Sequence, residues 1–151
     1  ISFIDEIMGQ PNSGKSTLSL HVEALLGSNC VAVIDGDDIR KGTNNLDYTE
    51  EGRKKNIYLI QDFAAQFDLP NPFKAVIVAA VSPYRDMREE FKKKNFVKEV
   101  YLFSNRKNSN QVENFEPPLK NALFLDTSRY GIDLCAKRIL HFSGLSPAGP
   151  S

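Results

Sequence analysis

Nine residues near the start of the chain, Gly9 to Thr17, have the types and spacing of a phosphate-binding loop. They read G-Q-P-N-S-G-K-S-T and fit the pattern G-x-x-x-x-G-K-[S/T] without a mismatch. Glycines let successive backbone N–H groups point at one anion, and the helix expected to follow adds the partial positive charge of its N-terminus. The pattern therefore predicts a P-loop that binds a nucleoside triphosphate.

The side chains of this loop have expected roles. Lys15 is placed to reach the β- and γ-phosphates of ATP, and the hydroxyl of Ser16 is placed to ligate Mg²⁺. The residues expected to contact the nucleotide are Gly9, Asn12, Ser13, Gly14, Lys15, Ser16 and Thr17. The chain lacks the N-K-x-D and D-x-x-G motifs of GTPase switches, and 151 residues is short for a motor ATPase. A small-molecule kinase is therefore favoured.

Acidic residues follow the apolar run from Val31 to Ile34, which reads as a buried strand. The segment D-G-D-D-I-R contains Asp35, Asp37, Asp38 and Arg40. Asp35 and the phosphate loop both follow the carboxyl ends of strands, the edge of a parallel sheet where ligands bind. If the two strands are near neighbours, Asp35 lies beside the phosphate loop. A carboxylate there would accept the proton of an acceptor hydroxyl or order water around Mg²⁺, and Arg40 would bind an anion. The alternative is a solvated acidic turn, with Asp38 as a surface or capping residue.

Short apolar runs alternate with amphipathic stretches along the chain, and these elements must position the loop and the carboxylates. The expected strands cover residues 2–8, 31–34, 75–81, 98–103 and 122–126. The expected helices cover residues 15–26, 50 to the prolines at 70 and 72, 83–94 and 132–142, with Thr49 as the cap of the second. This alternation predicts an α/β fold of the P-loop kinase type, with a mainly parallel, roughly five-stranded sheet between two layers of helices. Asp5 and Glu6 fit the first strand poorly, and residues 104–121 are expected to form a long loop.

The composition is that of one globular domain, expected over residues 1–143 with a flexible tail over 144–151. The formal net charge is zero, which disfavours a broad nucleic-acid-binding surface. The longest apolar run, residues 75–81, is far below the ~20 residues that cross a bilayer. Cys30 and Cys135 form no C-x-x-C motif and read as buried residues in a reducing compartment. We expect a cytoplasmic protein without a membrane partner.

Taken together, the motifs resemble those of the adenylylsulfate (APS) kinase family, P-loop enzymes that phosphorylate the ribose 3′-hydroxyl of APS. Residues 35–42 resemble the family's D-G-D-N-[IL]-R-x-G, and residues 48–57 resemble its F-S-x-x-D-R-x-E-N-I. Residues 82–85 match S-P-[YF]-R, while residues 115–118 and 125–127 match the later Y-E-P-P and L-D-T. The resemblance extends from the P-loop to Thr127.

The resemblance implies an ATP- and Mg²⁺-dependent kinase whose acceptor is a small nucleotide, most simply APS. Asp35, Lys15 and Asp37 would be catalytic, and Mg²⁺ would be held by Ser16 and, through water, by Asp35. The implied acceptor-binding residues are Asp37, Arg40, Tyr48, Arg53, Asn56 and Ser82. Tyr48 replaces the family's phenylalanine against the acceptor base and keeps a stacking face. Family members are often dimers, so a homodimer is also implied.

The chain departs from the family between Tyr101 and Phe115, where the family carries a longer lid with R-D-x-K-G-L-Y-x-x-A-R and N-F-[TK]-G. Arg106 and Lys107 would supply lid charge, or belong to a solvated loop. A short lid indicates a more open acceptor site. Two alternatives therefore stay open: a kinase acting on a hydroxymethylated base or 5′-hydroxyl of DNA, and a nucleotide-binding regulatory module without catalysis. The intact Lys15 and Asp35 argue against the second.

Overall fold

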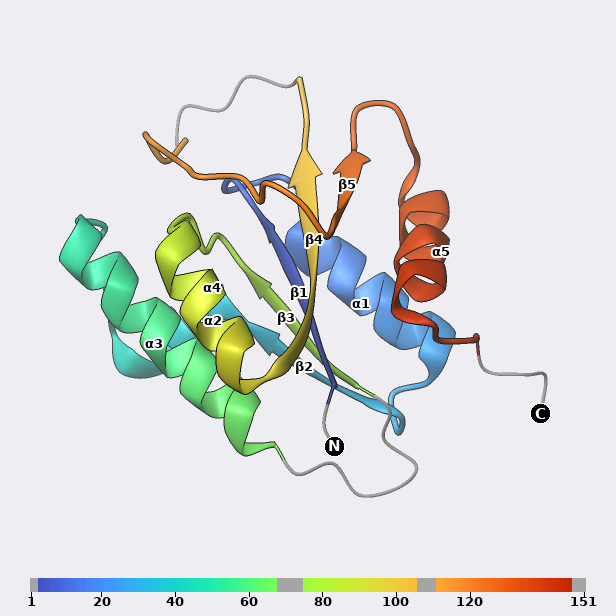
Figure 1. Ribbon diagram of the computed structural model, residues 1–151, viewed down its shortest axis with the longest axis horizontal. Helices are drawn as coiled ribbons and strands as arrows, with labels where there is room; N and C mark the ends of the chain where they lie inside the picture. Colours follow the sequence, from blue (N-terminus) through green and yellow to red (C-terminus); the bar gives the residue numbers. More distant parts are fainter. Residues whose placement is uncertain (1–2, 68–74, 106–110, 148–151) are drawn as a thin grey trace.

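The structure is a computed structural model that describes residues 3–67, 75–105 and 111–147. These residues form one sheet of parallel strands with helices on both faces (Figure 1). The strands are β1 (Phe3–Gly9), β2 (Val31–Asp35), β3 (Ala75–Ala80), β4 (Phe96–Phe103) and β5 (Ala122–Asp126). Their order across the sheet is β2-β3-β1-β4-β5. The predicted α/β class and five-stranded parallel sheet are confirmed.

Helices cover both faces of the sheet, with α1 and α5 on one side and α2, α3 and α4 on the other (Figure 1). Their bounds are α1 (Lys15–Leu26), α2 (Gly36–Thr43), α3 (Glu50–Gln66), α4 (Arg85–Lys94) and α5 (Ile132–Ser143). Thr49 caps α3 as predicted, because its hydroxyl accepts a hydrogen bond from the N–H of Gly52 at 3.4 Å. Pro70 and Pro72, expected to break this helix, lie outside the described residues.

The acidic segment after β2 is a helix and not a turn, which corrects one interpretation of the sequence. Asp35 caps α2, since its Oδ1 accepts a hydrogen bond from the N–H of Asp37 at 2.9 Å. Asp37 and Asp38 lie in the first turn and Arg40 in the last, where their charges complement the helix dipole. The cap and the dipole offset the poor helix propensity of a segment with two glycines in eight residues.

Two apolar clusters hold the layers together. One lies between the sheet and the α1–α5 face and includes Ile7, Val22 and Ile139, all fully buried. The other lies under α3 and includes Ile60 and Val76. All six residues of β3 are buried, as its continuous apolar sequence predicts for a strand covered on both faces.

The remaining boundaries differ from expectation by a few residues. β4 begins at Phe96 and not at Lys98, and α4 begins at Arg85, two residues after Pro83. The described residues between β4 and β5 contain no helix or strand, as predicted for the loop. Beyond α5, Leu145 packs against the first cluster, and residues 148–151 lie outside the described residues. The single domain and its flexible tail remain predictions.

Two carboxyl groups are buried in β1, where the sequence pattern fitted poorly. Asp5 is inaccessible to solvent and accepts a hydrogen bond from the hydroxyl of Ser143 at 2.7 Å. Burial raises the pKa of Asp5 to about 7, against the smaller lowering effects of Ser143 and Lys98. Glu6 stands beside Glu99 of β4 in the sheet, and burial followed by repulsion from Glu99 raises the pKa of Glu6 to about 7. Both groups therefore hold a proton more tightly inside the fold than an exposed carboxyl does.

These raised pKa values predict that stability falls as pH rises through neutrality. A buried carboxyl that binds its proton more tightly than the unfolded chain contributes stability below pH ~4, and this is lost as pH rises through about 7. Between pH 5 and 8 the loss is on the order of 3 kcal/mol for a fully buried carboxyl. Asp5→Asn should flatten the pH profile of the unfolding free energy, measured by urea denaturation, whereas Asp62→Asn, at an exposed position of α3, should leave it unchanged. Parallel profiles for wild type and Asp5→Asn would contradict the assignment.

Candidate active site

The P-loop connects the end of β1 to the start of α1. A Cβ on Gly9 would lie 2.6 Å from the carbonyl oxygen of Leu102 in β4, so only glycine lets the chain pass. Asn12 and Gly14 have φ angles of 63° and 96°, in the left-handed region that turns the loop back on itself. Gly14 caps α1 without a side-chain hydrogen bond, which leaves the backbone N–H groups of the first turn directed at the loop. The loop is therefore shaped for an anion.

Lys15 is buried in the loop and folds back over it. Its Nζ donates to the carbonyl oxygen of Gln10 at 2.8 Å and lies 3.5 Å from the hydroxyl of Ser13. Burial lowers the pKa of Lys15 to about 8, although the nearby charges of Asp37 and Asp35 act in the opposite direction. The predicted lysine and both predicted carboxylates thus lie in one electrostatic neighbourhood.

Ser16 and Asp35 join the P-loop to the end of β2. The hydroxyl of Ser16 donates to Oδ2 of Asp35 at 2.5 Å, while Oδ1 accepts from the backbone N–H of Asp37. β3 lies between β1 and β2, so this contact reaches across one intervening strand. The two bonds fix the orientation of the Asp35 carboxylate, and Asp37 remains exposed beside it.

The donor atoms at this point fit Mg²⁺. Ser16 and Asp35 offer hard oxygen ligands, which Mg²⁺ prefers, and the described residues contain no cluster of three or more carboxylate, histidine or cysteine side chains that would form a closed cage. Mg²⁺ at nucleotide sites takes one or two protein ligands and completes its shell with phosphate oxygens and water. The residues present therefore suit a metal that arrives with the nucleotide.

Arg40 and Tyr48, both predicted to bind the acceptor, form a stacked pair. The guanidinium carbon of Arg40 lies 4.2 Å from the ring centroid of Tyr48, which is 59% exposed. Nη1 of Arg40 also donates to the carbonyl oxygens of Asn45 and Asp47 at 3.1 and 3.0 Å. Arg40 therefore organises the loop that carries Tyr48.

Asn56 and Ser82 each present a buried polar side-chain atom: Oδ1 of Asn56 has no hydrogen-bond partner among the described residues, whereas the Ser82 hydroxyl lies beside the buried Glu6 carboxyl and acts to lower the pKa of Glu6. Nδ2 of Asn56 donates to the carbonyl oxygen of Gly36 at 3.3 Å, which leaves Oδ1 unpaired. Ser82 follows β3 with a φ of 46°, a strained value for a residue other than glycine. Buried polar atoms are nearly always paired, so the unpaired Oδ1 of Asn56 is a candidate for ligand contact. Arg53 is half-buried on the same helix as Asn56.

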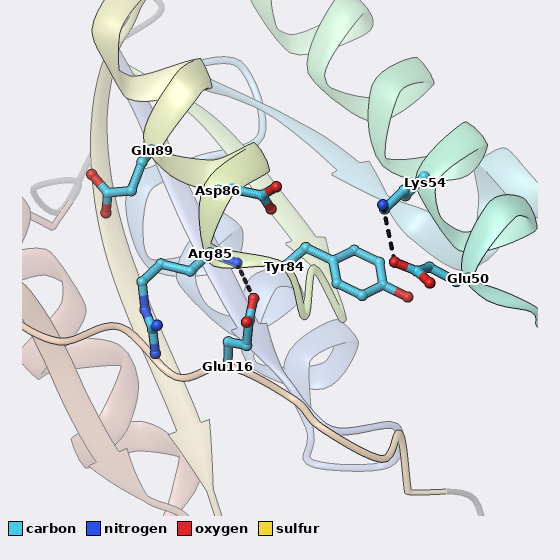
Figure 2. A pocket seen from close by; sticks show the side chains of 7 residues that line it. All are labelled: Glu50, Lys54, Tyr84, Arg85, Asp86, Glu89 and Glu116. Carbon is cyan, nitrogen blue, oxygen red and sulfur yellow. Dashed lines mark hydrogen bonds and ion pairs between the residues drawn. The ribbon is translucent and has the colours of Figure 1, made fainter.

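A pocket of about 480 Å³ lies between the first turns of α3 and α4 (Figure 2). Its lining residues are Glu50, Lys54, Tyr84, Arg85, Asp86, Glu89 and Glu116. Lys54 pairs with Glu50 at 3.0 Å and faces the ring of Tyr84, 5.4 Å from its centroid. None of the predicted acceptor residues lines this pocket, and its acidic side chains outnumber its basic ones, so we do not assign an anionic acceptor to it.

Comparison with known proteins decides the family. Residues 2–112 match the family model for adenylylsulphate kinase, and an adenylyl-sulfate kinase of Bacteroides thetaiotaomicron is 31% identical over 87% of this chain and 78% of its own length. The chain belongs to the adenylylsulphate kinase family. An adenylyl-sulfate kinase of Microcystis aeruginosa is 37% identical over 64% of this chain, a match that spans 54% of that relative. The structure of the Mycobacterium tuberculosis APS kinase with AMPPNP and APS has a TM-score of 0.76 at 22% identity, covers 93% of this chain and 96% of that one, and shows the shared fold.

Within the family pattern, Gly52 stands where F-S-x-x-D-R carries aspartate. A Cβ at Gly52 would lie 2.2 Å from the carbonyl oxygen of Asp47 and 2.5 Å from its Cβ. The Asp47 carboxylate accepts hydrogen bonds from the N–H and hydroxyl of Thr49, at 2.9 and 2.6 Å. These bonds hold the pKa of Asp47 below its usual range, so a carboxylate from the preceding loop lies close to the position of the missing one.

Sequence reasoning missed three residues that organise this region: Gln10, Asp47 and Arg88. Gln10 and Arg88 bond to groups far along the chain, at Val112 and Glu116, and no local pattern signals such pairs. The one available signal for Asp47 was the loss of aspartate at position 52. The prediction for Arg106 and Lys107 lies outside the described residues.

The contact at Gly52 predicts a sharp difference between two glycines. Gly52→Ala should lower the free energy of unfolding by about 1–3 kcal/mol, because the new Cβ meets backbone that cannot rotate away. Gly42→Ala, where a Cβ meets nothing within 4 Å on helix α2, should be neutral or stabilise by up to ~1 kcal/mol. Urea denaturation of both variants measures this, and equal stabilities would contradict the packing at Gly52.

Proposed function

We propose that this protein is an ATP- and Mg²⁺-dependent kinase that transfers the γ-phosphate of ATP to the 3′-hydroxyl of adenylylsulfate, with ADP as the second product. Family membership supports the activity, and one observation carries the assignment of the site. The P-loop hydroxyl of Ser16 is bonded to the Asp35 carboxylate, which brings a nucleotide grip and a candidate base to the same edge of the sheet.

The P-loop binds the donor. The N-terminal N–H groups of α1 and the Lys15 ammonium group supply positive charge to the β- and γ-phosphates. Mg²⁺ bound by Ser16 and, through water, by Asp35 would neutralise charge on the same phosphates. Lys15 turns from its intraloop contacts with Gln10 and Ser13 toward the phosphates when the nucleotide enters.

Asp35 is the candidate base. Its two oxygens are held by Ser16 and by the N–H of Asp37, so the carboxylate is preorganised before substrate binds. Asp35 accepts the proton of the acceptor hydroxyl as the bond from that oxygen to phosphorus forms and the bond to ADP breaks. Asp37 lies exposed beside it, where it contacts the acceptor.

The acceptor-binding residues take complementary parts of the nucleotide. Arg53 supplies charge to the phosphosulfate end, and the unpaired Oδ1 of Asn56 accepts a sugar hydroxyl. Tyr48, supported by the stacked Arg40, offers an aromatic face to the base. Ser82 contributes a buried hydroxyl at the end of β3.

Three further partners were considered from the sequence: DNA, a second copy of the chain and a membrane. The relatives reported above are named as adenylyl-sulfate kinases, and the zero net charge disfavours a polymeric acceptor, so DNA receives no support. The homodimer stays a prediction. In the part of the chain that the structure describes, no helix is both long and apolar enough to span a membrane.

Label transfer tests the proposal directly. The protein is incubated with γ-labelled ATP and Mg²⁺ and offered APS, hydroxymethylated DNA or a 5′-hydroxyl oligonucleotide. Label on APS alone is expected. Label on DNA alone would replace the acceptor, and label on none of the three with ATP binding intact would reject catalysis on these hydroxyls.

Asp35→Asn should reduce transfer by about 10²–10⁴-fold, because the amide cannot accept the proton. Nucleotide affinity should stay within about threefold, since Lys15 and the P-loop N–H groups, which bind the phosphates, are unchanged. Asp38→Asn is the matched control, as Asp38 is exposed in the first turn of α2 and should retain activity. Initial rates and nucleotide titration separate the two effects, and an active Asp35→Asn enzyme would remove the base from Asp35.

The pKa of Lys15 predicts pH-dependent nucleotide binding. Because burial lowers this pKa to about 8, the charged lysine predominates below pH 8, and binding above that pH must take up a proton. The Kd for a non-hydrolysable ATP analogue should rise up to about tenfold per pH unit above 8. Lys15→Arg, which stays charged, should show a flatter profile. Calorimetry at pH 7, 8, 9 and 9.5 measures this, and a flat wild-type profile would contradict the prediction.

A further inference from the structure

Residues 111–118, named the strap here, are attached at one end to the P-loop. Nε2 of Gln10 donates to the carbonyl oxygen of Val112 at 3.0 Å, and the N–H of Val112 donates to Oε1 of Gln10 at 2.7 Å. The side-chain amide of Gln10 thus exchanges two hydrogen bonds with the backbone of Val112, as residues on neighbouring β-strands do. Val112 is 5% exposed, so its backbone N–H and carbonyl groups have little access to water and depend on Gln10 for these bonds.

The other end of the strap caps α4. Tyr84, the N-cap residue of α4, makes no capping bond of its own, and Oε1 of Glu116 accepts from the N–H of Arg85 at 2.8 Å (Figure 2). The N–H of Glu116 also donates to the carbonyl oxygen of Pro83 at 2.9 Å. A carboxylate at a helix N-terminus is favoured by the helix dipole, so the strap satisfies an N–H of the first turn of α4 that its N-cap residue Tyr84 leaves unpaired.

Two arginines reinforce this end. Arg88 is 1% exposed and donates to the carbonyl oxygens of Glu116 at 2.6 Å and Ser82 at 2.8 Å. Its guanidinium group is paired with buried Glu99 at 3.3 Å. Arg85 donates through Nε and Nη2 to the carbonyl oxygen of Pro117, at 3.2 and 2.9 Å. The strap is therefore bonded to the segment that carries Ser82.

We propose that Gln10 and Glu116 are positioning residues, which set the P-loop and the segment from Ser82 to Arg85 at a fixed spacing for phosphoryl transfer. The sheet determines where β1 and β3 end, but not the path of the loops beyond them. The strap joins those loops through side chains that touch neither reacting group. The catalytic part of this inference rests on the proposed function, whereas the mechanical part does not.

The mechanical part is tested by hydrogen exchange on the protein without substrate. Gln10→Ala should speed exchange of the Val112 amide by about tenfold or more, and should also speed exchange of the Glu116 amide at the far end. Gln61→Ala is the matched control, because it removes a glutamine hydrogen bond of the same kind, from Nε2 to the carbonyl oxygen of Met87, that does not involve the strap. Faster exchange at Val112 with an unchanged Glu116 amide would overturn the proposal.

The catalytic part is tested by kinetics with APS. Gln10→Ala and Glu116→Ala should each raise the KM for APS and lower kcat, by about three- to tenfold in kcat/KM, with the Kd for an ATP analogue within about twofold. Glu116→Gln keeps an oxygen for the N–H of Arg85 and should restore most of the activity. The double alanine variant should lose less than the product of the two single losses, because the two residues act through one element.

The outcomes separate the two levels of inference. Wild-type kinetics in Gln10→Ala, or fully multiplicative losses in the double variant, overturn the positioning role alone. A loss explained by lower thermal stability, with Glu116→Gln as impaired as Glu116→Ala, does the same. A wild-type protein that transfers no label to APS overturns the proposed function and the positioning role with it, while the exchange experiment still reports whether the strap is one unit.

Discussion

All strands of the described sheet run in the same direction, and this constraint determines where chemistry is possible in the molecule. Parallel strands deliver their carboxyl ends to one edge, so the loops after β1, β2 and β3 emerge together although their residues are far apart in the sequence. The P-loop follows the end of β1, Asp35 is the last residue of β2, and Ser82 lies just after β3. The hydrogen bond between Ser16 and Asp35 is possible only because β1 and β2 are held in register by β3 between them.

The same sheet buries charged side chains. Glu6 and Glu99 are neighbours on β1 and β4, and Arg88 and Lys92 of α4 lie against them. A buried ion pair adds little net stability, because desolvation of both partners offsets their attraction. The pair instead orients the Arg88 side chain. Glu99 holds one side of its guanidinium group while the other nitrogens donate to the carbonyl oxygens of Ser82 and Glu116. Charge inside the core is thus used to orient loops at the edge.

Local signals account for what the sequence predicted well. The P-loop pattern, the Thr49 cap and the continuous apolar run of β3 depend on residues close together in the chain, and their elements lie where expected. Helix α2 was missed because its stability comes from the Asp35 cap and the dipole, against poor propensity. The position of β3 between β1 and β2 follows from tertiary packing, which chain order does not encode. Gln10 and Val112 are 102 residues apart, and neither has a neighbour that signals their pairing.

The two halves of the site differ in how closely they follow the family pattern. The donor half retains the full P-loop, with Lys15 buried and Ser16 bonded to Asp35. On the proposed acceptor half, glycine stands at position 52 in place of the family's aspartate, and Asp47 occupies the space of that side chain. Nη1 of Arg40 is used in hydrogen bonds to the loop that carries Tyr48. Arg53 makes no such side-chain contact in the part of the chain that the structure describes, which is why we propose Arg53, more than Arg40, as the partner of the acceptor's anionic end. Variation among related kinases is expected on this side, because every member must grip the same triphosphate while the wall around the acceptor can change with its substrate.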